Sequence, residues 1–157
     1  MKIVCNVTRG NEIESFHKVY AVALDEEGKT ILSAGDKNYI TCIRSAFKPF
    51  QASAAIAAGA TKEAGFTSEE IALMCASHNG ENIHVKIAKG MAKKLGLNIS
   101  HYECGKHAPH DKTSREKARK TGFTCFHNNC SGKHSGMLSL AKKLGVNPTG
   151  YTKINHP

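Results

Sequence analysis

The segment NNCSGKHSGMLSLAKKLG, residues 128–145, begins with polar residues and continues with apolar residues at the spacing of an α-helix. Three apolar side chains recur at intervals of three and four and therefore share one helical face: Met137, Leu140 and Leu144. We expect the helix to begin near Ser131 or Gly132 and to end at Gly145, because glycine commonly terminates helices. The apolar face is expected to be buried.

The same segment holds possible metal ligands. Cys130, Lys133 and His134 are three and four residues apart and fall on one helical face. A thiolate and a neutral imidazole suit Zn²⁺, whereas a lysine ligand would first have to lose its proton. From these residues alone, a surface position for Lys133 is the better interpretation. A phosphate-binding loop is rejected, because His127 and His134 stand where that motif needs Gly and Ser or Thr.

A serine and a lysine occur together in Ser45-Ala46-Phe47-Lys48. On a helix the two side chains share a face. A serine hydroxyl needs a base to become a useful nucleophile, and a lysine amine serves when burial disfavours its charged form. Such a spacing is common by chance, so from the tetrapeptide alone a helix-capping serine beside a surface lysine is preferred.

A second polar cluster contains Ser77, His78, Asn79 and Glu81 and follows an apolar segment. Backbone N–H groups at the start of the next predicted helix could face a carboxylate or an oxyanion. A capped turn between two elements explains the same residues. The two interpretations carry about equal weight.

The N-terminal region has strand patterns, and helical patterns follow from Ser45 onward. The predicted strands are Ile3–Thr8, Val19–Leu24 and Thr30–Ser33. Residues 25–28, Asp-Glu-Glu-Gly, predict a hairpin loop between the last two. The expected fold class is α+β, an antiparallel sheet packed with helices, in a single domain over residues 1–157.

Composition narrows the function classes. The chain has 157 residues, a formal net charge of +9 and six cysteines. The charges are scattered and the densest basic run, 106–120, has no aromatic residue to stack on bases, so nucleic-acid binding is disfavoured. No signal peptide or membrane-spanning apolar run is recognised, so we expect a cytoplasmic location and no membrane partner.

Four motifs, taken together, resemble those of one enzyme family. They are RSAFKPFQ at 44–51, CASHNGE at 75–81, ECGKHAP at 103–109 and NNCSGKH at 128–134. In their residues and in their order along the chain, they are similar to the motifs of the thermolabile, Rhizobium-type bacterial L-asparaginases, the L-asparaginase II family. The resemblance runs along the whole chain.

The resemblance implies hydrolysis of L-asparagine to L-aspartate and ammonia, in a fold like that of the serine β-lactamases and glutaminases. By motif position, Ser45 and Lys48 match a catalytic serine–lysine pair and Ser77 matches a second catalytic serine. Arg44 and His134 are candidates for holding the substrate. We expect Ser45 and Lys48 to lie within hydrogen-bond reach of each other, near Ser77.

The resemblance also implies a zinc ion. Cys130 and Lys133 match two of its ligands, while a third ligand and a second catalytic lysine are expected in a C-terminal half that this chain lacks. We therefore interpret the chain as the N-terminal half of the family, with zinc absent or weakly held. The expected partners are the substrate and either a second copy, as a homodimer, or the complementary half.

Two alternatives to an amidohydrolase remain open. One is a cytosolic zinc-binding interaction module that uses Cys104, His107, Cys130 and His134. The other is a non-catalytic relative or subunit that keeps the motifs.

Overall fold

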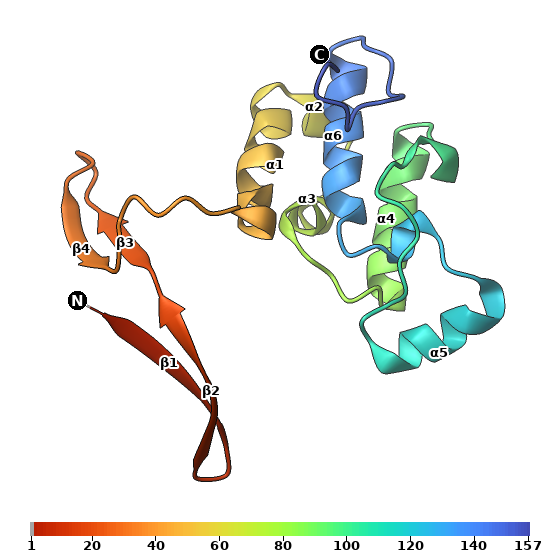
Figure 1. Ribbon diagram of the computed structural model, residues 1–157. Helices are drawn as coiled ribbons and strands as arrows, with labels where there is room; N and C mark the ends of the chain where they lie inside the picture. The colour runs from red at the N-terminus through yellow and green to blue at the C-terminus, as the bar shows by residue number, and fades with distance from the viewer. Residues whose placement is uncertain (1) are drawn as a thin grey trace. The chain divides into compact units, whose positions relative to one another are not determined.

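In the computed structural model, which describes residues 2–157, the chain forms two units that meet in sequence between Cys42 and Ile43. The first unit consists of two β-hairpins (Figure 1). Strands β1 (Ile3–Arg9) and β2 (Glu12–Val19) pair antiparallel, as do β3 (Ala21–Leu24) and β4 (Thr30–Ala34). The prediction of one domain over residues 1–157 stays a prediction.

Strand β2 is the element that the sequence patterns missed. It is rich in charged and polar residues, and its apolar side chains Ile13 and Phe16 are largely exposed. Its strand conformation follows from backbone pairing with β1 rather than from an apolar face. Gly10, at a φ of 61°, permits the tight turn between the two strands. The hairpin predicted at residues 25–28 is confirmed, with the Gly28 N–H donating to the Asp25 carbonyl at 3.1 Å.

The second unit is helical (Figure 1). Its α-helices are α1 (Lys48–Ala57), α2 (Ala60–Glu63), α3 (Ser68–Cys75), α4 (Asn82–Lys94), α5 (Lys112–Thr121) and α6 (Ser131–Lys143). The 3₁₀ turn η1 (Arg44–Phe47) precedes α1, while η2 (Ile99–His101) lies between α4 and α5 and η3 (Cys125–His127) lies between α5 and α6. With two small antiparallel sheets and six helices over residues 2–157, the α+β class is confirmed. The likeness to the serine β-lactamases stays a prediction.

Helix α6 is the centre of the helical unit and packs against α1, α2, α3 and α4. Its buried residues are mostly small: Ser131, Gly132, His134, Ser135, Gly136, Leu138, Ser139 and Ala141. The predicted apolar face is therefore wrong for Leu144, which is 57% exposed, whereas Met137 and Leu140 are half-buried and pack against the core. The physical reason is a close approach between helices. A Cβ at Gly132 would lie 2.2 Å from the Leu73 carbonyl oxygen of α3.

Helix α1 also buries small residues rather than its aromatic ones. Ala52 and Ala55 are buried, whereas Phe47 and Phe50 are exposed and stack on each other with ring centroids 5.5 Å apart. As in α6, short side chains allow α1 to lie close to α3 and α6.

Helix α3 begins with a capping box formed by Thr67 and Glu70. The Thr67 N–H donates to the Glu70 carboxylate at 2.8 Å, and the Glu70 N–H donates back to the Thr67 hydroxyl at 3.4 Å. Lys94 of α4 donates to the same carboxylate at 2.6 Å. The cap and this ion pair fix α3, whose C-terminal end leads directly into residues 76–81.

We expect Gly132→Ala to lower the free energy of unfolding by about 3 kcal/mol, because the new methyl group would overlap backbone atoms that cannot move aside. Gly90→Ala in α4 is the matched control. Its Cβ would meet only an ordinary 3.6 Å contact, so helix propensity should raise stability by about 0.5–1 kcal/mol. Chemical denaturation of both variants measures the difference. Equal effects would show that the α3–α6 approach is looser than described.

Candidate active site

Lys48, the first residue of α1, has its side chain buried in the helical unit, with 2% exposed. Its Nζ donates to the Ala76 carbonyl at 2.6 Å and to the Ser77 hydroxyl at 2.8 Å. Ala76 caps the C-terminal end of α3, where the helix dipole favours a cation. Lys48 thus links the start of α1 to the serine that follows α3.

Ser45 lies in the turn η1 and lines a cavity of about 350 Å³ together with Lys48. The full lining is Ile43, Arg44, Ser45, Phe47, Lys48, Gln51, Cys130 and Lys133. The Lys48 backbone N–H donates to the Ser45 carbonyl, but over residues 2–157 no side-chain hydrogen bond joins the two residues, so the expected contact between their side chains is not formed. The lysine side chain extends instead to the end of α3, where the Ala76 carbonyl and the Ser77 hydroxyl accept hydrogen bonds from its Nζ.

Arg44 lines the same cavity in an uncommon backbone conformation. Its φ of 52° is the only positive φ at a non-glycine residue in the described part of the chain. For a residue with a Cβ, this left-handed conformation costs about 1–3 kcal/mol, and such strain is concentrated at functional sites. The strained turn places the Arg44 side chain beside Ser45 and Lys48.

Cys130 and Lys133 line this cavity from the start of α6, so the structure brings together the two predicted zinc ligands. Two donors do not complete the four-coordinate site that zinc prefers. Over residues 2–157 no group of three or more His, Cys, Asp or Glu side chains is placed to hold a metal ion. These residues alone therefore do not fit a closed zinc site, and no reaction step is assigned to a metal.

The donor set of the alternative zinc module is likewise not assembled in the described residues. Cys104 donates its S–H to the Cys125 carbonyl, with 3.6 Å between sulfur and oxygen. Burial raises the pKa of the Cys104 thiol to about 12, which disfavours the thiolate that zinc requires.

His134 is buried on α6 and does not line the cavity. Its Nδ1 lies 2.6 Å from the Tyr151 hydroxyl, which itself accepts the Glu103 N–H at 2.9 Å. Because that N–H occupies an acceptor position of the hydroxyl, Tyr151 is free to donate to His134. Burial, followed by the nearby charge of Lys133, lowers the pKa of His134 to about 4. Substrate binding by His134 stays a prediction from the resemblance.

The whole chain was compared with known protein families. The family model described as L-asparaginase II matches residues 5–157. The chain belongs to the L-asparaginase II family. A comparison with curated proteins finds no match. Membership in the family supports an asparaginase-type, amidohydrolase function with a small-molecule substrate.

This member of the L-asparaginase II family has no helix within residues 2–157 that is long and apolar enough to cross a membrane.

Two residues near the candidate asparaginase site have contacts that sequence patterns did not indicate. His78, which is 4% exposed, binds Ser131 across 53 positions of sequence, and Tyr151 binds His134. The sequence patterns indicated His78 only as part of a polar cluster. Periodicity carries no signal for contacts of this kind, because the partners lie in different elements.

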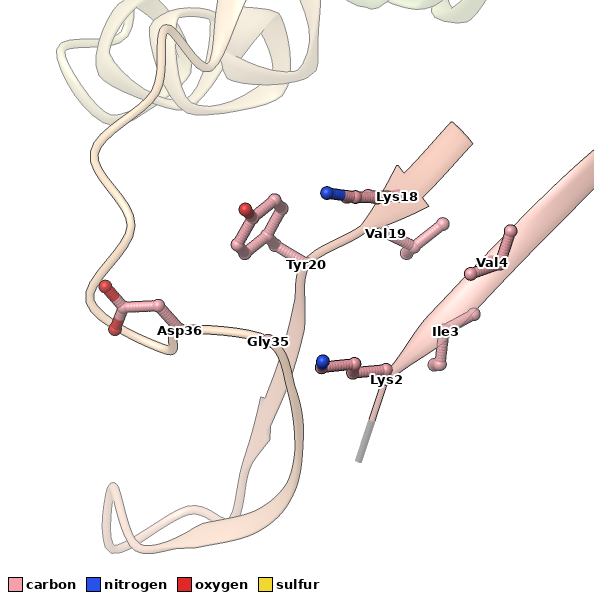
Figure 2. A pocket seen from close by; sticks show the side chains of 8 residues that line it. All are labelled: Lys2, Ile3, Val4, Lys18, Val19, Tyr20, Gly35 and Asp36. Atoms are coloured by element: carbon pink, nitrogen blue, oxygen red, sulfur yellow. The ribbon is translucent and has the colours of Figure 1, made fainter. Parts of the chain in front are cut away.

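A second cavity of about 350 Å³ lies within the hairpin unit (Figure 2). Its lining contains none of the predicted asparaginase site residues; it consists of Lys2, Ile3, Val4, Lys18, Val19, Tyr20, Gly35 and Asp36. The Tyr20 ring stacks on Tyr39 at 4.3 Å and covers Gly35, where a Cβ would lie 2.6 Å from the ring. We interpret the cavity as a gap left by hairpin packing.

The backbone strain at Arg44 is testable by comparing two substitutions that shorten its side chain. Arg44→Gly removes the Cβ that makes a positive φ unfavourable, whereas Arg44→Ala keeps the Cβ and loses the same guanidinium. The glycine variant should therefore be more stable than the alanine variant by about 1 kcal/mol. Urea denaturation monitored by circular dichroism measures the gap. An alanine variant that is the more stable of the two would place Arg44 in an ordinary conformation.

Proposed function

We propose that this chain, together with the complementary C-terminal half, hydrolyses L-asparagine to L-aspartate and ammonia by serine–lysine chemistry. The observation that carries the proposal is the contact between the buried Lys48 amine and the Ser77 hydroxyl, 2.8 Å apart. The membership in the L-asparaginase II family supports the reaction class. A lysine held against a serine is the arrangement that activates a hydroxyl nucleophile without histidine.

The proposed reaction begins with neutral Lys48, which takes the proton of Ser77 as the serine oxygen attacks the side-chain amide carbon of asparagine. Collapse of the tetrahedral intermediate breaks the C–N bond, and the proton leaves with ammonia. Water then attacks the aspartyl ester while Lys48 takes its proton, and Lys48 passes that proton to the serine oxygen as aspartate departs. Ser45, in the cavity that Lys48 also lines, is the second hydroxyl to which this proton could pass.

Recognition of the substrate is assigned to the cationic cavity. Arg44 and Lys133 both line it, and a guanidinium binds a carboxylate through two parallel hydrogen bonds. A cavity of about 350 Å³ accommodates a small amino acid. Arg44 is therefore proposed to bind the α-carboxylate of asparagine, which directs the side-chain amide toward the serines.

The remaining parts of the proposal rest mainly on the resemblance. Zinc binding by Cys130 and Lys133 requires further donors, and a second lysine outside residues 1–157 would complete the proton relay. The second lysine would come from the complementary C-terminal half, and the further zinc donors from that half or from a homodimer partner. A cytoplasmic location is proposed because all six cysteines are free thiols, as expected in a reducing compartment.

The experiment measures ammonia release from L-asparagine by the 157-residue chain, alone and mixed with the family's C-terminal half. Little or no turnover is expected from the chain alone, because residues that act as a unit lose their effect together. Turnover by the mixture supports the proposal. Full turnover by the isolated chain would show that the second lysine is dispensable.

Variants of the active preparation identify the reacting groups. Ser77→Ala and Lys48→Met should each lower kcat by about 10³-fold or more. Ser53→Ala is the control, because Ser53 is exposed on α1 and donates only to the Pro49 carbonyl. If Ser45→Ala abolishes turnover while Ser77→Ala retains it, Ser45 is the nucleophile and the direct Lys48–Ser77 pairing is not the reactive one.

A further inference from the structure

Ser77 and His78 are adjacent residues in opposite environments. Ser77 is exposed and accepts a hydrogen bond from Lys48, whereas the His78 side chain is buried with 4% exposed. The preceding Ala76 has extended backbone angles, φ −89° and ψ 157°. Successive side chains of an extended segment project to opposite sides, so the segment can direct Ser77 outward while His78 anchors it from beneath.

The hydrogen bonds of His78 define its protonation state. Its Nδ1 accepts the Gly80 backbone N–H at 3.1 Å, so that nitrogen carries a lone pair and no proton. Its Nε2 lies 2.8 Å from the Ser131 hydroxyl, and in the neutral ring it is the nitrogen that holds the proton and donates. Adding a second proton at Nδ1 would break the bond from Gly80.

Two bonds join the Ser77 segment to the beginning of α6. Besides the ring contact with Ser131, the His78 backbone N–H donates to the Asn129 carbonyl at 3.2 Å. Ser131 is fully buried as the first residue of α6. The turn before α6 and its first residues carry Cys130 and Lys133, so the contact ties the segment that bears Ser77 to the cavity wall formed by α6.

The surroundings of His78 are basic, with a group contributed by each neighbouring element. They are Lys48 of α1, His84 of α4, His110 before α5 and His127 of η3. The His84 ring stacks on His78 with centroids 5.1 Å apart. Burial, and after it these four groups, lower the pKa of His78 to about 4. The neutral ring is thus retained well into the acid range.

We propose that neutral His78, in the tautomer protonated at Nε2, is a positioning residue that holds Ser77 beside Lys48 by tying the segment 77–80 to the first residue of α6. The effect on turnover rests on the proposed function, but the tautomer and the tie to Ser131 do not. Protonation of His78 is expected to release the segment.

The first experiment uses nitrogen-15 NMR of the histidine rings in the 157-residue chain. The His78 signals should show the Nε2-protonated neutral ring at pH 7 and should not titrate until the pH approaches about 4. Ser131→Ala should change the Nε2 resonance while leaving the Nδ1 bond to Gly80 in place. An Nδ1-protonated ring at pH 7, or a titration near the ordinary value of about 6.5, would overturn the inference.

The second experiment compares turnover in the active preparation. His78→Gln keeps an N–H near the position of Nε2, whereas His78→Ala keeps neither hydrogen bond. With folding verified by circular dichroism, the alanine variant should lose about 10²-fold in kcat at little change in KM, and the glutamine variant should recover part of it. Ser131→Ala should lower kcat in the wild-type background and have little effect in His78→Ala, since the contact is then already absent.

The outcomes separate two failures. A folded His78→Ala variant with normal kcat, in an enzyme that depends on Ser77 and Lys48, overturns the positioning role and leaves the proposed function standing. Full activity in Ser77→Ala and Lys48→Met overturns the proposed function, while the NMR result still decides the tautomer. If His78→Ala does not fold, a normal kcat in a folded Ser131→Ala enzyme overturns the role.

Discussion

The close approach of α6 to α3 at Gly132 is the constraint on which the helical unit depends. With no side chain at that position, the α6 backbone lies directly against the Leu73 carbonyl. The approach brings the end of α3 near the beginning of α6, although the two are separated by more than fifty residues of sequence. The polar contacts of Lys48 and His78 lie at or near this junction, so they depend on the close packing of small residues.

Burying polar groups at such a junction is favourable only when their hydrogen bonds are satisfied. Lys48 binds the Ala76 carbonyl and Ser77, while His78 binds Gly80 and Ser131. The two side chains reach adjacent parts of the same short segment from different elements. Order in this segment therefore derives from tertiary contacts, since its own residues form neither helix nor strand.

The sequence predicted those features that local physical chemistry determines. The hairpin loop ending at Gly28 and the helix end at Gly145 both depend on neighbours within a few residues. Hydrophobic periodicity did not identify the most buried face of α6. It predicts that a leucine such as Leu144 is buried in preference to serine and glycine, whereas closely packed helices bury small residues. The pairing of Lys48 with Ser77, 29 positions apart, was likewise beyond local patterns; only the resemblance placed both residues at one site.

The charge of the cavity explains which end of an amino acid it suits. Arg44, Lys48 and Lys133 line it, and no carboxylate does. In a partly enclosed space, the cations of Arg44 and Lys133 attract an anionic group more strongly than they would in open solvent. A zwitterionic substrate also carries an ammonium, which these cations repel. The lining thus matches the carboxylate end of such a substrate, and an acidic or carbonyl group outside this lining must bind the amino end.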